Sequence, residues 1–208
     1  MARELIRDCL QENAIALANY NVGSNLDEKH RSTIRFEKRD VLQLTSQDLQ
    51  MSGPFNLIIC NPPYIHTKDP SVSRSVRKWE PSLALYPLPR STNTAPISSS
   101  QELRCKDEDI FYHKALSLAM GDGTDKIVLM EVGSKDQAIR VVQLATHLGL
   151  PSSAIIQIWR DWPDQKPTSE EETSITVENT SYAVKGSGLY RSVVIRRFGE
   201  PLYTESDL

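Results

Sequence analysis

A short apolar run that passes directly into two prolines is the feature that most constrains the fold of this chain. Residues 57–60 are Leu-Ile-Ile-Cys, which is typical of a buried strand, and residues 61–64 are Asn-Pro-Pro-Tyr. Pro62 and Pro63 cannot continue a central ladder, so the strand over residues 56–60 has to end at Asn61. We refer to residues 61–64 as the Asn-Pro-Pro-Tyr turn.

The Asn-Pro-Pro-Tyr turn combines groups that suit the binding of a planar NH2 group. Asn61 lies at the carboxyl end of a predicted strand, where open α/β sheets bind their ligands. The prolines restrict the backbone, so the carbonyl groups of Asn61 and Pro62 keep a fixed direction, and Tyr64 adds a flat ring beside them. Asn-Pro alone is an ordinary turn signal, and the preceding strand is what favours a function. The turn is expected to act by positioning a nitrogen rather than by a strong base.

Four segments of the chain resemble one enzyme family. The Asn-Pro-Pro-Tyr turn resembles the hallmark of S-adenosylmethionine-dependent methyltransferases that act on adenine N6, cytosine N4 or glutamine N5. Residues 76–85 resemble the Glu-Pro-x-x-Ala-Leu segment of the HemK/PrmC-like protein-(glutamine-N5) methyltransferases. Asp109 with Tyr112, and Glu131 with Gly133, resemble later motifs of that family in the same order. The resemblance covers most of residues 5–198.

This resemblance implies a fold, an activity and a set of site residues. The fold is the α/β, Rossmann-like fold of class I S-adenosylmethionine-dependent methyltransferases. The activity is methyl transfer to the side-chain amide nitrogen of glutamine in the Gly-Gly-Gln motif of a peptide-chain release factor. Asn61 would bind that amide, Pro62 would supply a second acceptor, Pro63 would complete the rigid catalytic turn, and Tyr64 would pack over the amide. Glu80 would shape the substrate side.

The chain departs from the family where the cofactor should bind. The family has a first strand and a glycine-rich loop that approaches the cofactor, but no Gly-x-Gly pattern occurs here before Asn61. We therefore expect one partial methyltransferase domain over residues 1–208, lacking that strand and loop, with poor S-adenosylmethionine binding. The resemblance places Asp8 at the ribose hydroxyls and Asp40 at the adenine edge, with Asn61 beside the methyl group.

Composition bounds the partners and the location. The chain has 208 residues, a formal net charge of −3 and a pI near 5.8, which disfavours a nucleic-acid partner. Its three cysteines lack metal-ligand spacing, so neither a zinc site nor a disulfide framework is expected. No apolar run has the length of a membrane span, and the first residues do not resemble a secretory signal. The resemblance favours a mitochondrial location in a eukaryote and a cytoplasmic one otherwise, and leaves the oligomeric state open.

Two other functions stay open on the sequence. Enzymes that methylate adenine N6 in DNA or RNA share the Asn-Pro-Pro-Tyr motif, and a basic surface around Asn61 would favour that activity. A non-catalytic remnant or binding module would keep the substrate pocket without the cofactor site.

Alternating helices and strands are predicted along the chain. Apolar spacing predicts a helix over residues 4–20, a short strand at Ile34 and Phe36, and a strand over residues 126–132. Asp109 is expected to cap a helix that runs to Ala119. Ser134 and Gln137 form a capping-box pattern at the start of another helix, which ends at Gly149 and Pro151. Residues 155–159 and 189–196 are predicted as closing strands, paired antiparallel at one sheet edge.

Two further segments lack signals of regular structure. Residues 87–106 are rich in Ser, Thr, Pro and Asn, and residues 168–181 are polar and acidic. Both are expected to be mobile surface loops.

Overall fold

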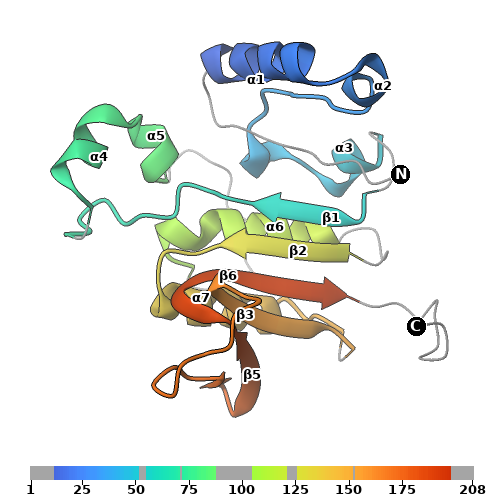
Figure 1. The fold of residues 1–208 in the computed structure, drawn as a ribbon. Coiled ribbons are helices and arrows are strands. Elements are labelled where there is room, and N and C mark those ends of the chain that lie inside the picture. The colour runs from blue at the N-terminus through green and yellow to red at the C-terminus, as the bar shows by residue number, and fades with distance from the viewer. Residues whose placement is uncertain are drawn as a thin grey trace.

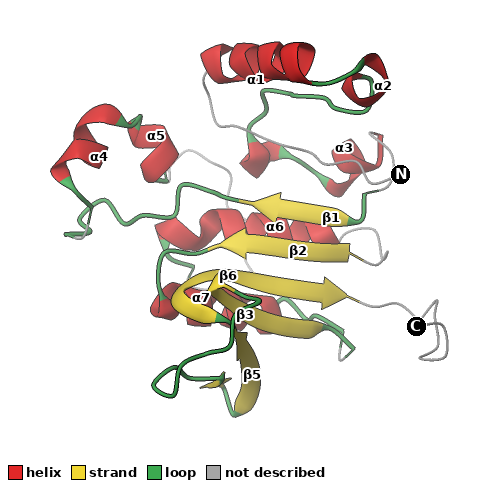
Figure 2. Cartoon of the chain, in the orientation of Figure 1, coloured by secondary structure: helices red, strands yellow, loops and turns green. Residues whose placement is uncertain are grey.

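An α/β fold is built around a six-stranded mixed sheet (Figures 1 and 2). The computed structural model describes residues 12–51, 55–70, 72–87, 105–120, 126–151 and 153–197. The strands are ordered β1-β2-β6-β3-β5-β4 across the sheet. Their bounds are β1 (Leu57–Cys60), β2 (Lys126–Glu131), β3 (Ile155–Trp162), β4 (Ser174–Val177), β5 (Thr180–Lys185) and β6 (Ser187–Arg197).

Strand direction changes several times across the described sheet. β1 and β2 are parallel, with Leu57 opposite Ile127, and β6 is antiparallel to β2 on one side and to β3 on the other. β3 and β5 are parallel, while β5 and β4 form an antiparallel hairpin. The predicted antiparallel pairing of residues 155–159 with 189–196 is confirmed. The prediction that this pair closes one edge is wrong, because β5 and β4 extend the sheet beyond β3.

Helices α6 (Ile110–Met120) and α7 (Lys135–His147) cover one face of the sheet. Their side chains form the main core with those of β2, β3 and β6. In Figure 1 both helices lie on the far side of the sheet. The remaining helices are short or lie away from this core: α1 (Glu12–Asn25), α2 (Glu28–Arg31), α3 (Ser46–Met51), α4 (Arg74–Trp79), α5 (Ser82–Leu85) and the 3₁₀ helices η1 (Val41–Gln43) and η2 (Asp107–Asp109).

The sequence signals of α7 are confirmed in detail. The Ser134 hydroxyl accepts a hydrogen bond from the backbone N–H of Gln137 at 3.2 Å, so Ser134 caps the helix as predicted. The predicted apolar stripe faces the core, and Ala138, Val141 and Val142 are fully buried. Gly149 follows the helix with a φ of 77°, a backbone conformation that glycine adopts without strain.

The structure corrects the prediction for the amino-terminal third of the chain. The predicted helix over residues 4–20 is described only from Glu12, continues to Asn25, and leaves Leu17 and Tyr20 exposed at 60% and 70%. Ile34 and Phe36 lie in irregular backbone rather than in a strand. An isolated extended segment has no ladder hydrogen bonds, and no described strand lies beside this one. Apolar spacing therefore predicted the helix but did not predict that Leu17 and Tyr20 would be exposed.

A β-hairpin replaces part of a predicted loop. Residues 168–181 were expected to be irregular, yet β4 and the start of β5 fall within them, so that expectation is wrong for the second half. The two turn residues, Glu178 and Asn179, both have positive φ, as a two-residue hairpin turn of the right twist requires. Ile175 and Val177 of β4 are buried against the core. Of the other predicted loop, residues 88–104 lie outside the described residues, as do residues 4–11 of the predicted first helix.

One edge and one face of the sheet carry exposed apolar side chains. β1 is the terminal strand of the described sheet and pairs only with β2 there. Ile59 of β1 is 48% exposed, and Ile127 and Ile155 are exposed on the same face. Ile58, the neighbour of Ile59, points to the opposite face and packs against the main core. An uncharged edge strand with an exposed apolar face favours self-association.

Within the described residues, no helix has the length and apolarity to cross a bilayer.

We predict that Ile59→Lys reduces self-association and changes the free energy of unfolding by less than about 0.5 kcal/mol, because Ile59 is already half exposed. Ile58→Lys is the matched control from the other face of the same strand, and it should cost about 3 kcal/mol or more because it buries a charge. Sedimentation velocity and denaturant unfolding measure the two effects. Equal destabilisation by both substitutions would contradict the assignment of faces.

Candidate functional site

The Asn-Pro-Pro-Tyr turn lies where the sequence predicts, directly beyond the carboxyl end of β1. The strand ends at Cys60, Pro62 and Pro63 are buried, and Asn61 is exposed. The Asn61 amide has no hydrogen-bond partner among the described residues. An exposed amide on a backbone held by two buried prolines can accept and donate hydrogen bonds to a ligand with little reorganisation.

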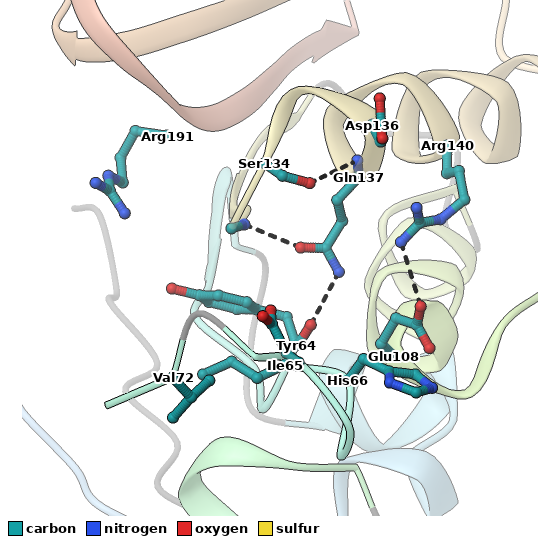
Figure 3. A pocket seen from close by; sticks show the side chains of 12 residues that line it. Tyr64, Ile65, His66, Val72, Glu108, Ser134, Asp136, Gln137, Arg140 and Arg191 are labelled. Atoms are coloured by element: carbon teal, nitrogen blue, oxygen red, sulfur yellow. Dashed lines mark hydrogen bonds and ion pairs between the residues drawn. The ribbon is translucent and has the colours of Figure 1, made fainter. Parts of the chain in front are cut away.

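Tyr64 anchors the other end of the turn through both its side chain and its backbone. Its hydroxyl donates a hydrogen bond to Glu131 Oε1 at 2.7 Å, and its carbonyl oxygen accepts one from Gln137 Nε2 at 3.1 Å. Its ring lies against Gly133, where the Cβ of any larger residue would come within 3.1 Å of the ring. Gly133 therefore permits the close approach of Tyr64 to the end of β2. In Figure 3 the ring lies directly below the turn from β2 into α7.

The surroundings of Tyr64 keep its hydroxyl protonated. Burial raises the pKa of Tyr64 to about 12, and the hydrogen bond to Glu131 and the charge of that carboxylate add to the rise. Arg191 opposes the shift. Because the neutral phenol is the form that donates to Glu131, the anchor is intact at physiological pH.

A buried polar network supports Tyr64 from the helices. Gln137 Oε1 accepts from the backbone N–H of Gly133 at 2.9 Å, and Gln137 Nε2 also donates to Asp109 Oδ1 at 3.2 Å. Asp109 is almost completely buried and accepts two hydrogen bonds from Arg140. Burial acts to lower the pKa of Arg140, but the hydrogen bond and charge of Asp109, together with the charges of Glu108 and Asp136, leave the pKa raised. Arg140 is therefore held as a cation beside Asp109.

This network corrects the predicted role of Asp109. The sequence places Asp109 at the cap of a helix, but it lies in η2, just before α6, and its carboxylate turns to Arg140 and Gln137. Tyr112, one turn later, is fully buried, and its hydroxyl donates to the carbonyl oxygen of Glu131 at 2.7 Å. Burial raises the pKa of Tyr112, with nearby Cys60 and Asp109 adding to the rise. The hydrogen-bond network around Tyr64 thus includes all four residues that the family motifs single out after the turn: Asp109, Tyr112, Glu131 and Gly133.

A cavity of about 360 Å³ opens beside Tyr64 (Figure 3). Its walls come from Tyr64 and the segment after it, from η2, from the start of α7 with the residues just before it, and from β6. Figure 3 shows Gln137 crossing from α7 to the Tyr64 carbonyl, with Arg140 paired to Glu108 at the other side. Charges of both signs line the cavity: Asp69, Glu108, Asp136, Arg140 and Arg191. Among the described residues, no group of His, Cys, Asp and Glu side chains is arranged to hold a metal ion.

The other residues named from the sequence lie apart from the Tyr64 network. Glu80 is exposed at the end of α4, but the segment after it returns to the turn, because the Ile65 N–H donates to the Leu85 carbonyl at 3.0 Å. Asp40 is exposed and its carboxylate caps η1 by accepting from the Leu42 N–H at 3.0 Å. Burial lowers the pKa of Lys114, and nearby Asp40 opposes that shift. Asp8 lies outside the described residues.

Sequence reasoning missed the site roles of Gln137, Arg140 and Arg191. Gln137 was predicted only as part of a helix cap, and its cap pattern gives no sign of a hydrogen bond to a residue 73 positions away. Arg140 and Arg191 carry no local signal that separates them from surface arginines. Comparison of the sequence with protein families and with curated proteins finds no match.

We predict that the Tyr64 hydroxyl makes stability fall between about pH 10 and pH 12. Its pKa rises from 10.0 to about 12 in the fold, so its stabilising contribution is fully present below pH 10 and is lost as the pH rises through 12. Denaturant unfolding across this pH range, compared with Tyr64→Phe, isolates the contribution from those of the other tyrosines. The free-energy difference between the two proteins should be constant below pH 10 and shrink above it. A constant difference up to pH 12 would exclude this role for Tyr64.

Proposed function

We propose that this chain carries the amide-binding half of an S-adenosylmethionine-dependent methyltransferase that modifies the side-chain amide of glutamine. The observation that carries the proposal is the exposed amide of Asn61, which has no hydrogen-bond partner within the described part of the chain and stands on a turn fixed by buried prolines and by Tyr64. The turn lies at the carboxyl end of a parallel strand, which is where α/β sheets bind ligands. The sequence resemblance supplies the reaction class, and a peptide-chain release factor is the proposed substrate.

The proposed chemistry needs positioning more than acid–base strength. The side-chain oxygen of Asn61 and the main-chain carbonyl oxygen of Pro62 would accept hydrogen bonds from the two N–H groups of the glutamine amide and turn its nitrogen lone pair toward the methyl donor. As the bond from nitrogen to the methyl group forms and the bond from sulfur to it breaks, one N–H proton would pass to solvent. An amide nitrogen is a poor nucleophile, so a fixed near-attack geometry at about 3–3.5 Å is the main contribution such a site can make. The anchoring of Tyr64 at both hydroxyl and carbonyl supports this rigid arrangement.

The described residues do not complete a site for the methyl donor. The carboxylate of Asp40, proposed at the adenine edge, accepts a hydrogen bond from the Leu42 N–H, and residues 1–60 contain no Gly-x-Gly pattern. S-adenosylmethionine would supply the methyl group when bound, and Asp40 and Asp8 are the residues that the resemblance assigns to it. This imbalance favours, as a second candidate, a module that binds an amide-bearing peptide without methylating it.

We predict that Asn61→Ala lowers methyl transfer to a Gly-Gly-Gln peptide at least 100-fold, equivalent to about 2.7 kcal/mol, with little change in stability. The assay uses labelled S-adenosylmethionine at millimolar concentration to offset weak binding. Asn56→Ala is the matched control, because Asn56 is an exposed asparagine at the opposite end of β1. Near-full transfer by Asn61→Ala would remove Asn61 from the site.

Calorimetric titration with S-adenosylhomocysteine separates the two candidates. We expect a dissociation constant weaker than about 1 mM, or less than about 4 kcal/mol of binding free energy. The reason is that Asp40, the described residue assigned to the adenine edge, already accepts a hydrogen bond from the Leu42 N–H. Binding of the peptide without the cofactor would favour the non-catalytic module. Micromolar cofactor affinity, worth about 8 kcal/mol, would show that the cofactor site lies elsewhere in the chain.

A further inference from the structure

We propose that Gln137 is the positioning residue of the Asn-Pro-Pro-Tyr turn. Gln137 is buried at 3% exposure, and its side-chain amide makes three hydrogen bonds. It accepts from the Gly133 N–H at 2.9 Å and donates to the Tyr64 carbonyl at 3.1 Å and to Asp109 at 3.2 Å. One amide therefore ties the turn to the end of β2 and to the start of α6.

The Tyr64 carbonyl is the point at which the turn still needs a constraint. The prolines fix φ at positions 62 and 63, but they do not fix where the whole turn lies beyond the end of β1. The hydrogen bond from Tyr64 to Glu131 holds the far end of a side chain, which can rotate about its own bonds. Gln137 instead holds the main chain, three residues from Asn61. Its loss would allow Asn61 and the Pro62 carbonyl to shift together.

The position of Gln137 is itself fixed by a charged pair. Asp109 receives two hydrogen bonds from Arg140, and this ion pair is only partly exposed at the arginine. Asp109 Oδ1 takes one N–H of Gln137, which directs the other N–H to the Tyr64 carbonyl. An amide supplies both donors and the acceptor that Gly133 needs, whereas a carboxylate at this position would face Asp109 with like charge. The residue type follows from these three partners.

The inference rests on the proposed function, and the experiment tests the two separately. Gln137→Met keeps the length of the side chain and removes all three hydrogen bonds. Leu144→Ala is the control, because Leu144 is buried in the same helix two turns farther along and its loss destabilises α7 without removing a bond to the turn. Gln137→Asn, which keeps an amide but is too short to reach all three partners, serves if Gln137→Met does not fold.

Amide hydrogen exchange gives the readout that needs no turnover. The Ile65 N–H, bonded to the Leu85 carbonyl at 3.0 Å, reports on the turn, and the amides of β2 report on global opening. Compared with the parent chain, exchange at Ile65 should become at least tenfold faster in Gln137→Met and change less than twofold in Leu144→Ala, in which the loss of global stability speeds exchange in β2. Unchanged exchange at Ile65 in Gln137→Met would overturn the proposal.

Methyl transfer gives the readout that a merely structural role would not move. With the cofactor and peptide of the Asn61 assay, Gln137→Met should lower kcat at least tenfold and leave the KM for S-adenosylmethionine within twofold, while Leu144→Ala keeps kcat. Faster exchange at Ile65 with an unchanged kcat would also overturn the proposal. If the parent chain transfers no methyl group, the proposed function fails, and the exchange result alone decides whether Gln137 positions the turn.

Discussion

The double anchoring of Tyr64 is the constraint on which the candidate site depends. A turn that leaves the end of a strand has no ladder hydrogen bonds, so other contacts must fix its place. Here the Tyr64 hydroxyl binds Glu131 and the Tyr64 carbonyl binds Gln137, on either side of the turn from β2 into α7. The buried prolines fix the conformation of the turn, and Tyr64 fixes its location. Asn61 can then stay exposed while its direction is held.

The same contacts couple the turn to the core of the fold. Gln137 joins Tyr64 to the Asp109–Arg140 pair, and Tyr112 joins Glu131 to α6. A buried hydrogen-bond network stabilises the fold when each of its polar groups has a partner. Removing one group leaves another unpaired, which costs free energy. Loss of a member of this polar network, such as Arg140, should therefore be felt at Asn61, even though Arg140 touches neither the turn nor Asn61.

Local signals decided which features could be predicted from the sequence. β1, β2 and α7 carry their own signals in apolar runs, prolines and the Ser134 cap, and the structure follows them. The β4–β5 hairpin was missed because its turn pairs Asn179 with Glu178, a residue that rarely adopts positive φ. The partner of Gln137 lies 73 residues away, so no local pattern could indicate it. The Asn-Pro-Pro-Tyr turn was predictable as a candidate site, whereas its supporting network was not.

The two edges of β1 differ in their backbone pairing, because one edge is bonded to β2 and the other is unpaired in the described sheet. On the β2 side, the turn is anchored and the core is closed. Away from β2, the edge of β1 is unpaired in the described sheet, Ile34 and Phe36 form no strand, and the Asp40 carboxylate caps η1. Figure 1 shows α1, α2 and α3 lying beyond that free edge. A strand paired with β1 would satisfy its free backbone groups. The edge of β1 is therefore the part of the described sheet at which a further strand could pair, next to the turn that carries Asn61.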